Sequence, residues 1–320
     1  MIRAGLALLL AFVGVAVWSP GVQAGQPWHD GYFPNVVLTD QDGRKHAFYD
    51  DLIKGKVVAL NFIYTKCKDV CPADTAQMLQ VQDLLGDRVG RDVYFYSISL
   101  DPANDTPRVL KRYRHMFGIH STWLFLTGKK SDIVLIQRKL GLIGERVPSL
   151  KEHNTSLIVG NETTAQWIKR SPYDHPKVLA NLLSDGLRNY ADAGAAAMQS
   201  FAAAKQISGQ TRGDYLFRTR CTACHTVGGG DKLGPDLKGV VAARSRGWLT
   251  RWLKEPDKMI AEKDPVAVAL KARYRNLPMP NLGLNDVDAE ALIAYLATVD
   301  RTTVATQTSR QASSNPLRAQ

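Results

Sequence analysis

The sequence predicts two folded domains: an α/β domain with a central mixed sheet flanked by helices, and after it a smaller all-α domain. Two observations support this division. Short apolar strand patterns alternate with helical patterns as far as about residue 190, which is typical of βα units around a sheet. Beyond about residue 208 the helical patterns are short, Gly and Pro separate them, and no strand alternation follows. A length of 320 residues fits two domains of ordinary size.

The elements of the first domain follow one another along the chain. The predicted strands cover residues 57–64, 93–100 and 123–126, and the helices between and after them centre on residues 78–85, 106–117 and 131–140. Residues 155–159 and 164–168, joined at Gly160-Asn161, predict a closing hairpin. A last helix is predicted over 176–190.

The composition then changes and marks the second domain. An Ala-rich stretch predicts a linker or helical spacer. The all-α domain has helical patterns over 211–220, 247–254 and 286–298, and the Thr/Ser/Gln-rich end of the chain is predicted to be disordered. The predicted boundaries are 1–24 for a signal peptide, 25–190 for the α/β domain, 191–207 for the linker, 208–300 for the all-α domain and 301–320 for the tail.

The composition limits the possible functions. With 45% hydrophobic and 22% charged residues the chain is a folded globular protein, and four Cys are too few for a disulfide-built scaffold. The net charge of +11 is spread along the chain, with 22 basic against 18 acidic residues in 25–190 and 15 against 11 in 205–300. Because no dense Lys/Arg run is interleaved with aromatics, the charge indicates a mildly basic solvated surface and not a nucleic-acid face. An acidic protein partner or an anionic lipid surface stays open.

The N-terminal segment has the pattern of a secretory signal. One basic residue, Arg3, precedes an apolar stretch over 4–18, and small residues Val22 and Ala24 occupy the positions before a cleavage site. We therefore expect cleavage after Ala24 and export to the periplasm or an equivalent compartment. The competing interpretation is an uncleaved membrane anchor, for which the apolar stretch is short. No Cys lies near this segment, which excludes lipidation at an N-terminal Cys.

The clearest motif lies in the second domain. Cys221, Cys224 and His225 form the C-x-x-C-H pattern of c-type haem attachment. Two thiols at this spacing can add to the two vinyl groups of one haem, and the adjacent His can then ligate the iron. A zinc site would need a second pair of ligands, which this domain lacks.

Residues 208–300 resemble a class I cytochrome c domain. The resemblance rests on the C-x-x-C-H motif, on Gly234-Pro235-Asp236-Leu237, on Leu277-Pro278-Met279-Pro280-Asn281-Leu282 and on the final helix. It implies covalent haem at Cys221 and Cys224, axial iron ligation by His225 and Met279, and a hydrogen bond from the His to the Pro235 carbonyl. Met259 is the rival thioether, but the flanking prolines favour Met279. Two filled axial positions favour electron transfer over oxygen chemistry.

The other two cysteines, Cys67 and Cys71, follow a predicted buried strand and stand at the start of a helix whose first turn holds Pro72. We expect the helix N-terminus to lower the pKa of Cys71, and Lys66 and Lys68 to add to this effect on both thiols. Such a place suits a redox-active thiol pair or a metal site. Two soft thiolates favour Cu(I), and one added imidazole makes Cu(II) acceptable as well.

The best candidate for that imidazole is His153, one of seven His, because its loop leads directly into a strand. A strand start can place it beside the corner that holds the two cysteines.

Residues 25–190 resemble the Sco/SenC family of thioredoxin-like proteins, which bind copper and help to assemble the Cu-A centre of cytochrome c oxidase. The resemblance implies that Cys67, Cys71 and His153 are the copper ligands. This sequence departs from the family pattern at Lys68, where many members of the family have Pro. The supporting segments are Asn61-Phe62-Ile63-Tyr64-Thr65-Lys66-Cys67, Val70-Cys71-Pro72, Ser99-Leu100-Asp101-Pro102, Asp105-Thr106-Pro107 and His153 ahead of Ser156-Leu157-Ile158.

Two related thioredoxin-fold families fit less well. A peroxiredoxin would have Pro and Thr where Leu60 and Tyr64 stand before Cys67. A thioredoxin would have two residues between its cysteines, and a Pro in place of Asn154 before the following strand.

These observations predict an exported protein that carries copper and haem. The leading hypothesis is copper delivery to the copper-bearing subunit of cytochrome c oxidase, or reduction of that subunit's cysteines, with single electrons passing through the haem. The alternatives are a thiol-disulfide oxidoreductase in which copper is incidental, and an electron carrier that docks through its Sco-like domain. Zinc or a disulfide in place of copper stays open, as does the classification as an enzyme.

Overall fold

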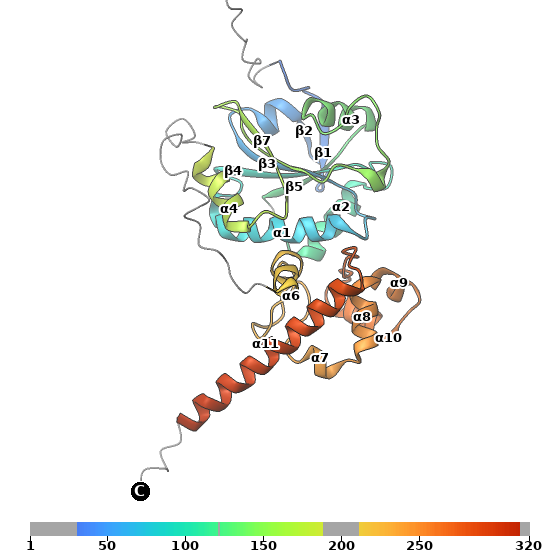
Figure 1. The fold of residues 1–320 in the computed structure, drawn as a ribbon. Coiled ribbons are helices and arrows are strands. Elements are labelled where there is room, and N and C mark those ends of the chain that lie inside the picture. The colour runs from blue at the N-terminus through green and yellow to red at the C-terminus, as the bar shows by residue number, and fades with distance from the viewer. Residues whose placement is uncertain (1–30, 121, 188–210, 314–320) are drawn as a thin grey trace, which may run out of the picture.

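A computed structural model describes residues 31–120, 122–187 and 211–313, which form two bodies in contact with each other (Figure 1). The predicted signal peptide (1–24) and linker (191–207) lie outside the described residues. The first body is the α/β domain and the second the all-α domain, so both predicted fold classes are confirmed.

The first domain is built on a seven-stranded mixed sheet in the order β2-β1-β5-β4-β3-β6-β7. The central pairs β3·β4 and β4·β5 are parallel, and all other pairs are antiparallel. The strands are β1 Val37–Asp40, β2 Lys45–Ala47, β3 Val57–Ile63, β4 Val93–Ser99, β5 Trp123–Thr127, β6 Leu157–Asn161 and β7 Gln166–Arg170.

Helices cover both faces of this sheet, and for that reason β3 is buried at every position. Val57, Ala59 and Ile63 face a core closed by α1 (Val70–Leu85), α2 (Pro107–Phe117), α4 (Pro176–Asn181) and η4 (Leu182–Gly186). The alternate residues Val58 and Leu60 face a core closed by η1 (Phe48–Ile53) and α3 (Lys130–Lys139). Two short 3-10 turns, η2 (Gly86–Arg88) and η3 (Leu150–Glu152), complete the domain.

The closing hairpin is present, but its predicted turn is wrong. Gly160 and Asn161 belong to β6, and the turn lies over 162–165. Gly160 is required for a different reason: a Cβ at this position would meet Cε3 of Trp167 at 2.2 Å. This glycine therefore admits the indole of the paired strand and does not form the turn.

The second domain is all-α and has its own apolar core, to which Leu216, Phe217, Leu292 and Leu296 contribute. Its first and last helices cross closely at Gly213, where a Cβ would meet the Ala291 carbonyl oxygen at 2.1 Å. The elements are α6 Arg212–Leu216, η6 Phe217–Cys221, α7 Val240–Ala243, α8 Arg246–Lys254, α9 Pro256–Ala261, α10 Pro265–Arg273 and α11 Asp286–Ser313.

One prediction for this domain is wrong in part. Residues 301–313, assigned to a disordered tail, continue α11. This stretch contains no Pro or Gly that would end a helix. Within the described parts of the chain, no helix is both long and apolar enough to cross a membrane.

Candidate functional site

The two cysteines of the first domain lie at the corner between β3 and α1. The Cys67 amide donates to the Tyr64 carbonyl at 3.1 Å, and the Cys71 amide donates to Cys67 Sγ at 3.5 Å. Asp105 holds the corner in place, because it accepts hydrogen bonds from the Thr65 amide at 3.1 Å and from the Ser99 hydroxyl at 2.6 Å. Both cysteines are free thiols and both are buried.

The two thiols have opposite electrostatic character. A hydrogen bond from the Cys71 side chain, supported by the amides of Cys71 and Asp69, lowers the pKa of Cys67 to about 5. The same hydrogen bond to Cys67 and burial raise the pKa of Cys71. The predicted lowering of the Cys71 pKa is therefore wrong. The two sulfur atoms share one proton, because two adjacent thiols cannot both ionise easily. At neutral pH the site holds one thiolate and one thiol.

His153 lies beside this pair. Its Nε2 is 3.6 Å from Cys71 Sγ, and its Nδ1 donates to the Leu150 carbonyl at 2.7 Å. Because a carbonyl only accepts, Nδ1 carries the hydrogen of this bond, and Nε2 is the ring nitrogen that faces the thiols. A capping box between Ser149 and Glu152 fixes the turn that carries this ring.

Cys71 thus contacts both of the other predicted copper ligands, Cys67 and His153. Over the residues that the structure describes, no three His, Cys, Asp or Glu side chains are already grouped around one metal position. The donor types, two sulfurs and one imidazole nitrogen, suit a soft metal ion. The roles of Cys67, Cys71 and His153 as redox thiols and copper ligands stay predictions.

One further buried group at this site was missed from the sequence. Asp74, one turn after Cys71 on α1, is 3% exposed, and burial raises the pKa of its carboxyl to about 7 although a hydrogen bond from Tyr173 opposes this rise. Its Oδ1 has no hydrogen-bond partner among the described residues. A single Asp near the start of a predicted helix gives no signal in a sequence, because it is usual on a solvated face.

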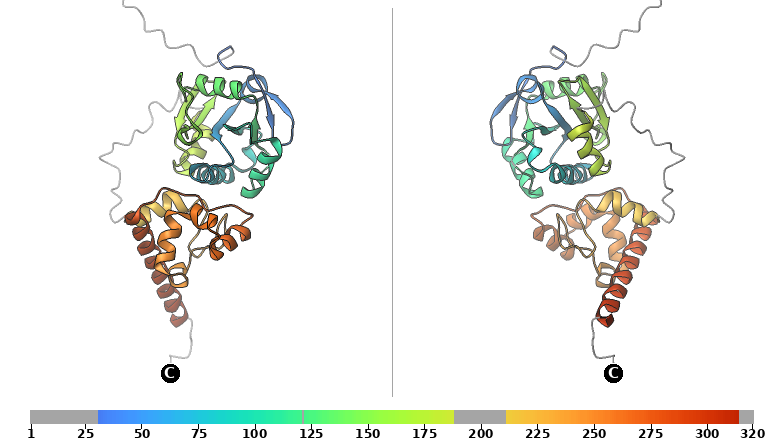
Figure 2. Two further views of the ribbon diagram at one scale, coloured as in Figure 1. Left: turned by 90° about the vertical axis from the view of Figure 1, so that its right-hand side faces the viewer. Right: turned by 90° about the vertical axis from the view of Figure 1, so that its left-hand side faces the viewer.

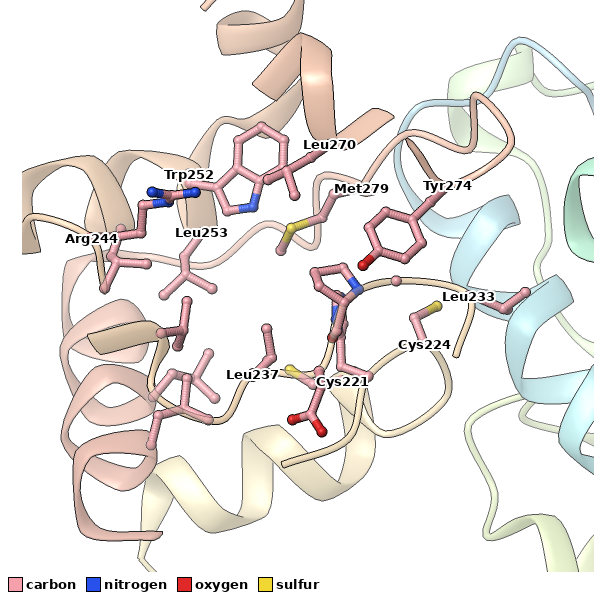
Figure 3. Close-up of a pocket in the computed structure, with 18 of the residues that line it drawn as sticks. Cys221, Cys224, Leu233, Leu237, Arg244, Trp252, Leu253, Leu270, Tyr274 and Met279 are labelled. Atoms are coloured by element: carbon pink, nitrogen blue, oxygen red, sulfur yellow. The ribbon is translucent and has the colours of Figure 1, made fainter. Parts of the chain in front are cut away.

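The second domain contains a cavity of about 330 Å³ with a mainly apolar lining. Cys221, Cys224, His225 and Met279 all line it, together with side chains of α8, α10 and α11. Figure 3 shows the Met279 sulfur pointing into this space, with Cys221 and Cys224 on the opposite wall. The rival Met259 is buried in α9 and is not among the residues lining this cavity.

The groups around His225 fix the orientation of its ring and leave one ring nitrogen without a hydrogen. Its Nδ1 donates to the Pro235 carbonyl at 2.8 Å, which leaves Nε2 free, and burial lowers the pKa of the ring so that it is neutral. A Cβ at Gly234 would meet His225 Cε1 at 2.5 Å, so only glycine allows this ring position. Burial raises the pKa of both Cys221 and Cys224 to about 12. The cavity and its donors fit a haem, while the individual roles stay predictions.

Comparison with known families agrees with this division. Residues 31–179 match the family model described as SCO1/SenC, and residues 210–300 match the model described as Cytochrome c. The chain joins a SCO1/SenC domain to a cytochrome c domain. The SCO1/SenC domain carries Cys67, Cys71 and His153, and the cytochrome c domain carries the haem motif.

Relatives from bacteria resemble the SCO1/SenC domain. The SCO1 protein homolog of Bacillus subtilis is 37% identical over 93 residues, which are 29% of this chain and 47% of that protein. The SCO2-like protein of Rickettsia felis is 33% identical over 110 residues, 34% of this chain and 51% of that protein. The chain therefore spans about half the length of these relatives.

Two solved structures are also similar to this domain. A SCO1/SenC family lipoprotein from Bacillus anthracis is 27% identical with a TM-score of 0.42, covering 47% of this chain and 92% of that one. The copper-bound ScoI of Arabidopsis thaliana is 23% identical with a TM-score of 0.38, covering 45% of this chain and 90% of that one.

Proposed function

We propose that this protein is an exported copper carrier with a covalently bound haem, which delivers copper to the copper-bearing subunit of cytochrome c oxidase or takes part in assembling its Cu-A centre. The observation that carries the proposal is the contact of His153 Nε2 with Cys71 Sγ at 3.6 Å, next to the Cys67 sulfur. The match of residues 31–179 to the SCO1/SenC model supports this reading. The signal-like pattern of residues 1–24 supports export.

Copper is the cargo of the first domain. The Cys67 thiolate supplies one soft donor without losing a proton, and Cys71 supplies a second when it releases its proton. His153 supplies a nitrogen donor whose direction the Leu150 carbonyl fixes. Two thiolates and one imidazole hold both Cu(I) and Cu(II), so the ion can change charge without leaving the site.

In the second domain Cys221 and Cys224 would hold the haem covalently, and His225 and Met279 would supply the ligands of its iron. When bound, the haem supplies a centre that gains and loses one electron. The hydrogen bond to Pro235 keeps the His225 ring in its binding orientation, and the apolar walls exclude water. A one-electron centre matches Cu(I)/Cu(II) better than it matches a dithiol, which loses two electrons and two protons when its disulfide forms.

Copper titration of the reduced, haem-loaded chain tests this function. We expect one copper per chain in the parent protein and its loss in His153→Ala, with an accompanying change of the haem absorbance as Cu(II) is added. The matched control is His115→Ala, which removes an exposed imidazole from α2. Equal copper binding by the parent and His153→Ala, or no binding by the parent, contradicts the proposal.

A second candidate function is thiol-disulfide exchange, and the adjacency of the two thiols favours it. The Cys71 amide lies 3.5 Å from Cys67 Sγ, and the spacing of the two cysteines allows a reversible disulfide. Exchange with a glutathione redox buffer that proceeds equally well in His153→Ala and without copper supports this alternative. Loss of function in His153→Ala while exchange persists counts against it.

A further inference from the structure

We propose that the cytochrome c domain is a cap over the Cys67–Cys71 corner, and that it must move away before a protein acceptor reaches these cysteines. The interaction surface is thus internal to the chain, and its occupant is the second domain. The need for an acceptor rests on the proposed function, whereas the capping contact does not.

The first part of this contact joins the two functional loops directly. The Asn281 amide donates to the Lys68 carbonyl at 2.9 Å. Lys68 follows Cys67, and Asn281 lies two residues after Met279. The loop that carries the thioether of one site is therefore hydrogen-bonded to the loop that carries the thiols of the other.

The centre of the contact is apolar. Ala223, between the two haem-motif cysteines, is 7% exposed and belongs to the same apolar cluster as Cys67 and Cys71. Cys224, Leu233 and Leu277 pack against that cluster. Figure 3 shows Leu233 and Cys224 on the side of the haem cavity that faces the ribbon of the first domain.

α1 is covered on the side away from the sheet as well as on the side toward it, in part by α4, which packs against it. All eight residues from Cys71 to Met78 are buried, although three of them, Asp74, Thr75 and Gln77, are polar. A helix with one face in water would alternate between buried and exposed positions with a period of 3.6 residues. The two views in Figure 2 and the view in Figure 1 place α1 between the sheet and the all-α domain.

The rim of the contact is polar and includes two exposed arginines. The Arg220 guanidinium lies over the Tyr173 ring at 5.5 Å, and Tyr173 in turn donates to Asp74 on α1. The Arg275 guanidinium lies at the C-terminus of α2, where a Cβ on Gly118 would meet its Nη1 at 2.5 Å. A cation is favourable at this negative end of a helix. An apolar centre with a polar rim is the anatomy of a reversible interface.

The cap has a direct consequence for exchange with a partner. In the docked chain Cys67 is 5% and Cys71 1% exposed. An acceptor must bring its own ligands or thiols to the sulfur atoms, and that approach needs an open side which the docked arrangement does not provide. Exchange with a protein therefore requires the undocked arrangement, and its rate depends on how much of the chain is undocked.

Thiol labelling of the haem-loaded full chain tests the cap without any partner. Haem attachment consumes Cys221 and Cys224, so that only Cys67 and Cys71 report. We expect Arg220→Glu/Arg275→Glu to speed labelling by a bulky polyethylene-glycol maleimide about tenfold, because the rate follows the undocked fraction. The matched variant Arg220→Lys/Arg275→Lys keeps both charges and should label at the parent's slow rate. An unchanged haem spectrum shows that the second domain stays folded.

A second pair of variants isolates the loop contact. Asn281→Pro removes the amide that donates to Lys68, whereas Asn281→Ala keeps it and loses only the side-chain bonds. We expect faster labelling in Asn281→Pro than in Asn281→Ala. Equal labelling of Arg220→Glu/Arg275→Glu and the parent overturns the cap, as does equal labelling of the two Asn281 variants. A failure of copper binding in the titration would refute the proposed function and leave these labelling rates unaffected.

Discussion

For the single residues of the thiol site, the sequence predicted the positions but not the direction in which the pKa of Cys71 is shifted. The sequence predicted that Cys67, Cys71 and His153 lie close together, and the structure places them in contact through Cys71. The prediction was possible because strand ends and helix starts meet at one edge of a sheet. The sequence predicted the wrong direction for the Cys71 pKa, since that depends on which thiol donates to the other. A hydrogen bond of this kind depends on side-chain geometry that no pattern encodes.

The lowered pKa of Cys67 predicts a specific pH dependence. Alkylation of this thiol by iodoacetamide should stay nearly constant above pH 6 and fall about tenfold per unit below pH 5, as the thiolate becomes protonated. Cys71→Ala removes the hydrogen bond to Cys67 and should raise the midpoint of this profile. Stopped-time labelling read by mass spectrometry measures both. A parent midpoint near the ordinary thiol value would contradict the assignment of Cys67 as the thiolate.

The position of the His225 ring depends on the absence of a side chain at Gly234. Gly234→Ala should displace the imidazole and cost about 1–3 kcal/mol of unfolding free energy, because the new methyl group has no space. Denaturant unfolding followed by haem absorbance measures this loss. The control is Gly247→Ala on α8, where nothing lies within 4 Å and φ is not positive. That change should be neutral or stabilising, and an equal loss in both variants would count against the steric argument.

Among the elements, the buried central strands, the closing hairpin and the long helices were predictable, whereas the short strands β1 and β2 were not. β3 carries apolar residues at nearly every position because helices cover both faces, and that pattern survives in the sequence. β2 at the edge of the sheet has three residues and its neighbour β1 has four, which are too few to show alternation. Gly160-Asn161 resembles a turn, but the close approach of Trp167 explains the glycine. A glycine required by a neighbour and a glycine required by a turn look alike in sequence.

The close packing between β6 and β7 predicts that Gly160 cannot be replaced without a loss of stability. Gly160→Ala should destabilise the SCO1/SenC domain by about 1–3 kcal/mol, since its Cβ would overlap the Trp167 ring. Tryptophan fluorescence during urea unfolding measures the change. Gly144→Ala, in the same domain with nothing within 4 Å, is the matched control. If Gly160→Ala proves as stable as this control, the indole has room to move and the glycine has another role.

At the scale of the whole molecule, the two domains were predictable separately but their contact was not. Each domain carries motifs whose chemistry fixes residue types and spacings, and these motifs survive in a single sequence. Ala223, Leu233 and Leu277 are ordinary apolar residues of a helical domain, so nothing marks them as contacts of another domain. The arrangement depends on the complementarity of two surfaces, which only the folded chain displays.

The cytochrome c domain has a core of its own, which predicts that the proposed copper site and the proposed haem site can be lost one at a time. The core residues Leu216, Phe217, Leu292 and Leu296 of the cytochrome c domain pack among α6, η6 and α11, whereas Ala223 and Cys224 at the docked face pack with the apolar cluster that holds the thiols. Cys67→Ser/Cys71→Ser should therefore abolish copper binding while haem attachment and the unfolding midpoint of the cytochrome c domain stay unchanged. Haem absorbance, metal analysis and denaturant unfolding on one sample provide the comparison. Loss of haem attachment in this variant would mean that the cap also stabilises the second domain, and then the docked form, not the isolated domains, would be the unit that folds.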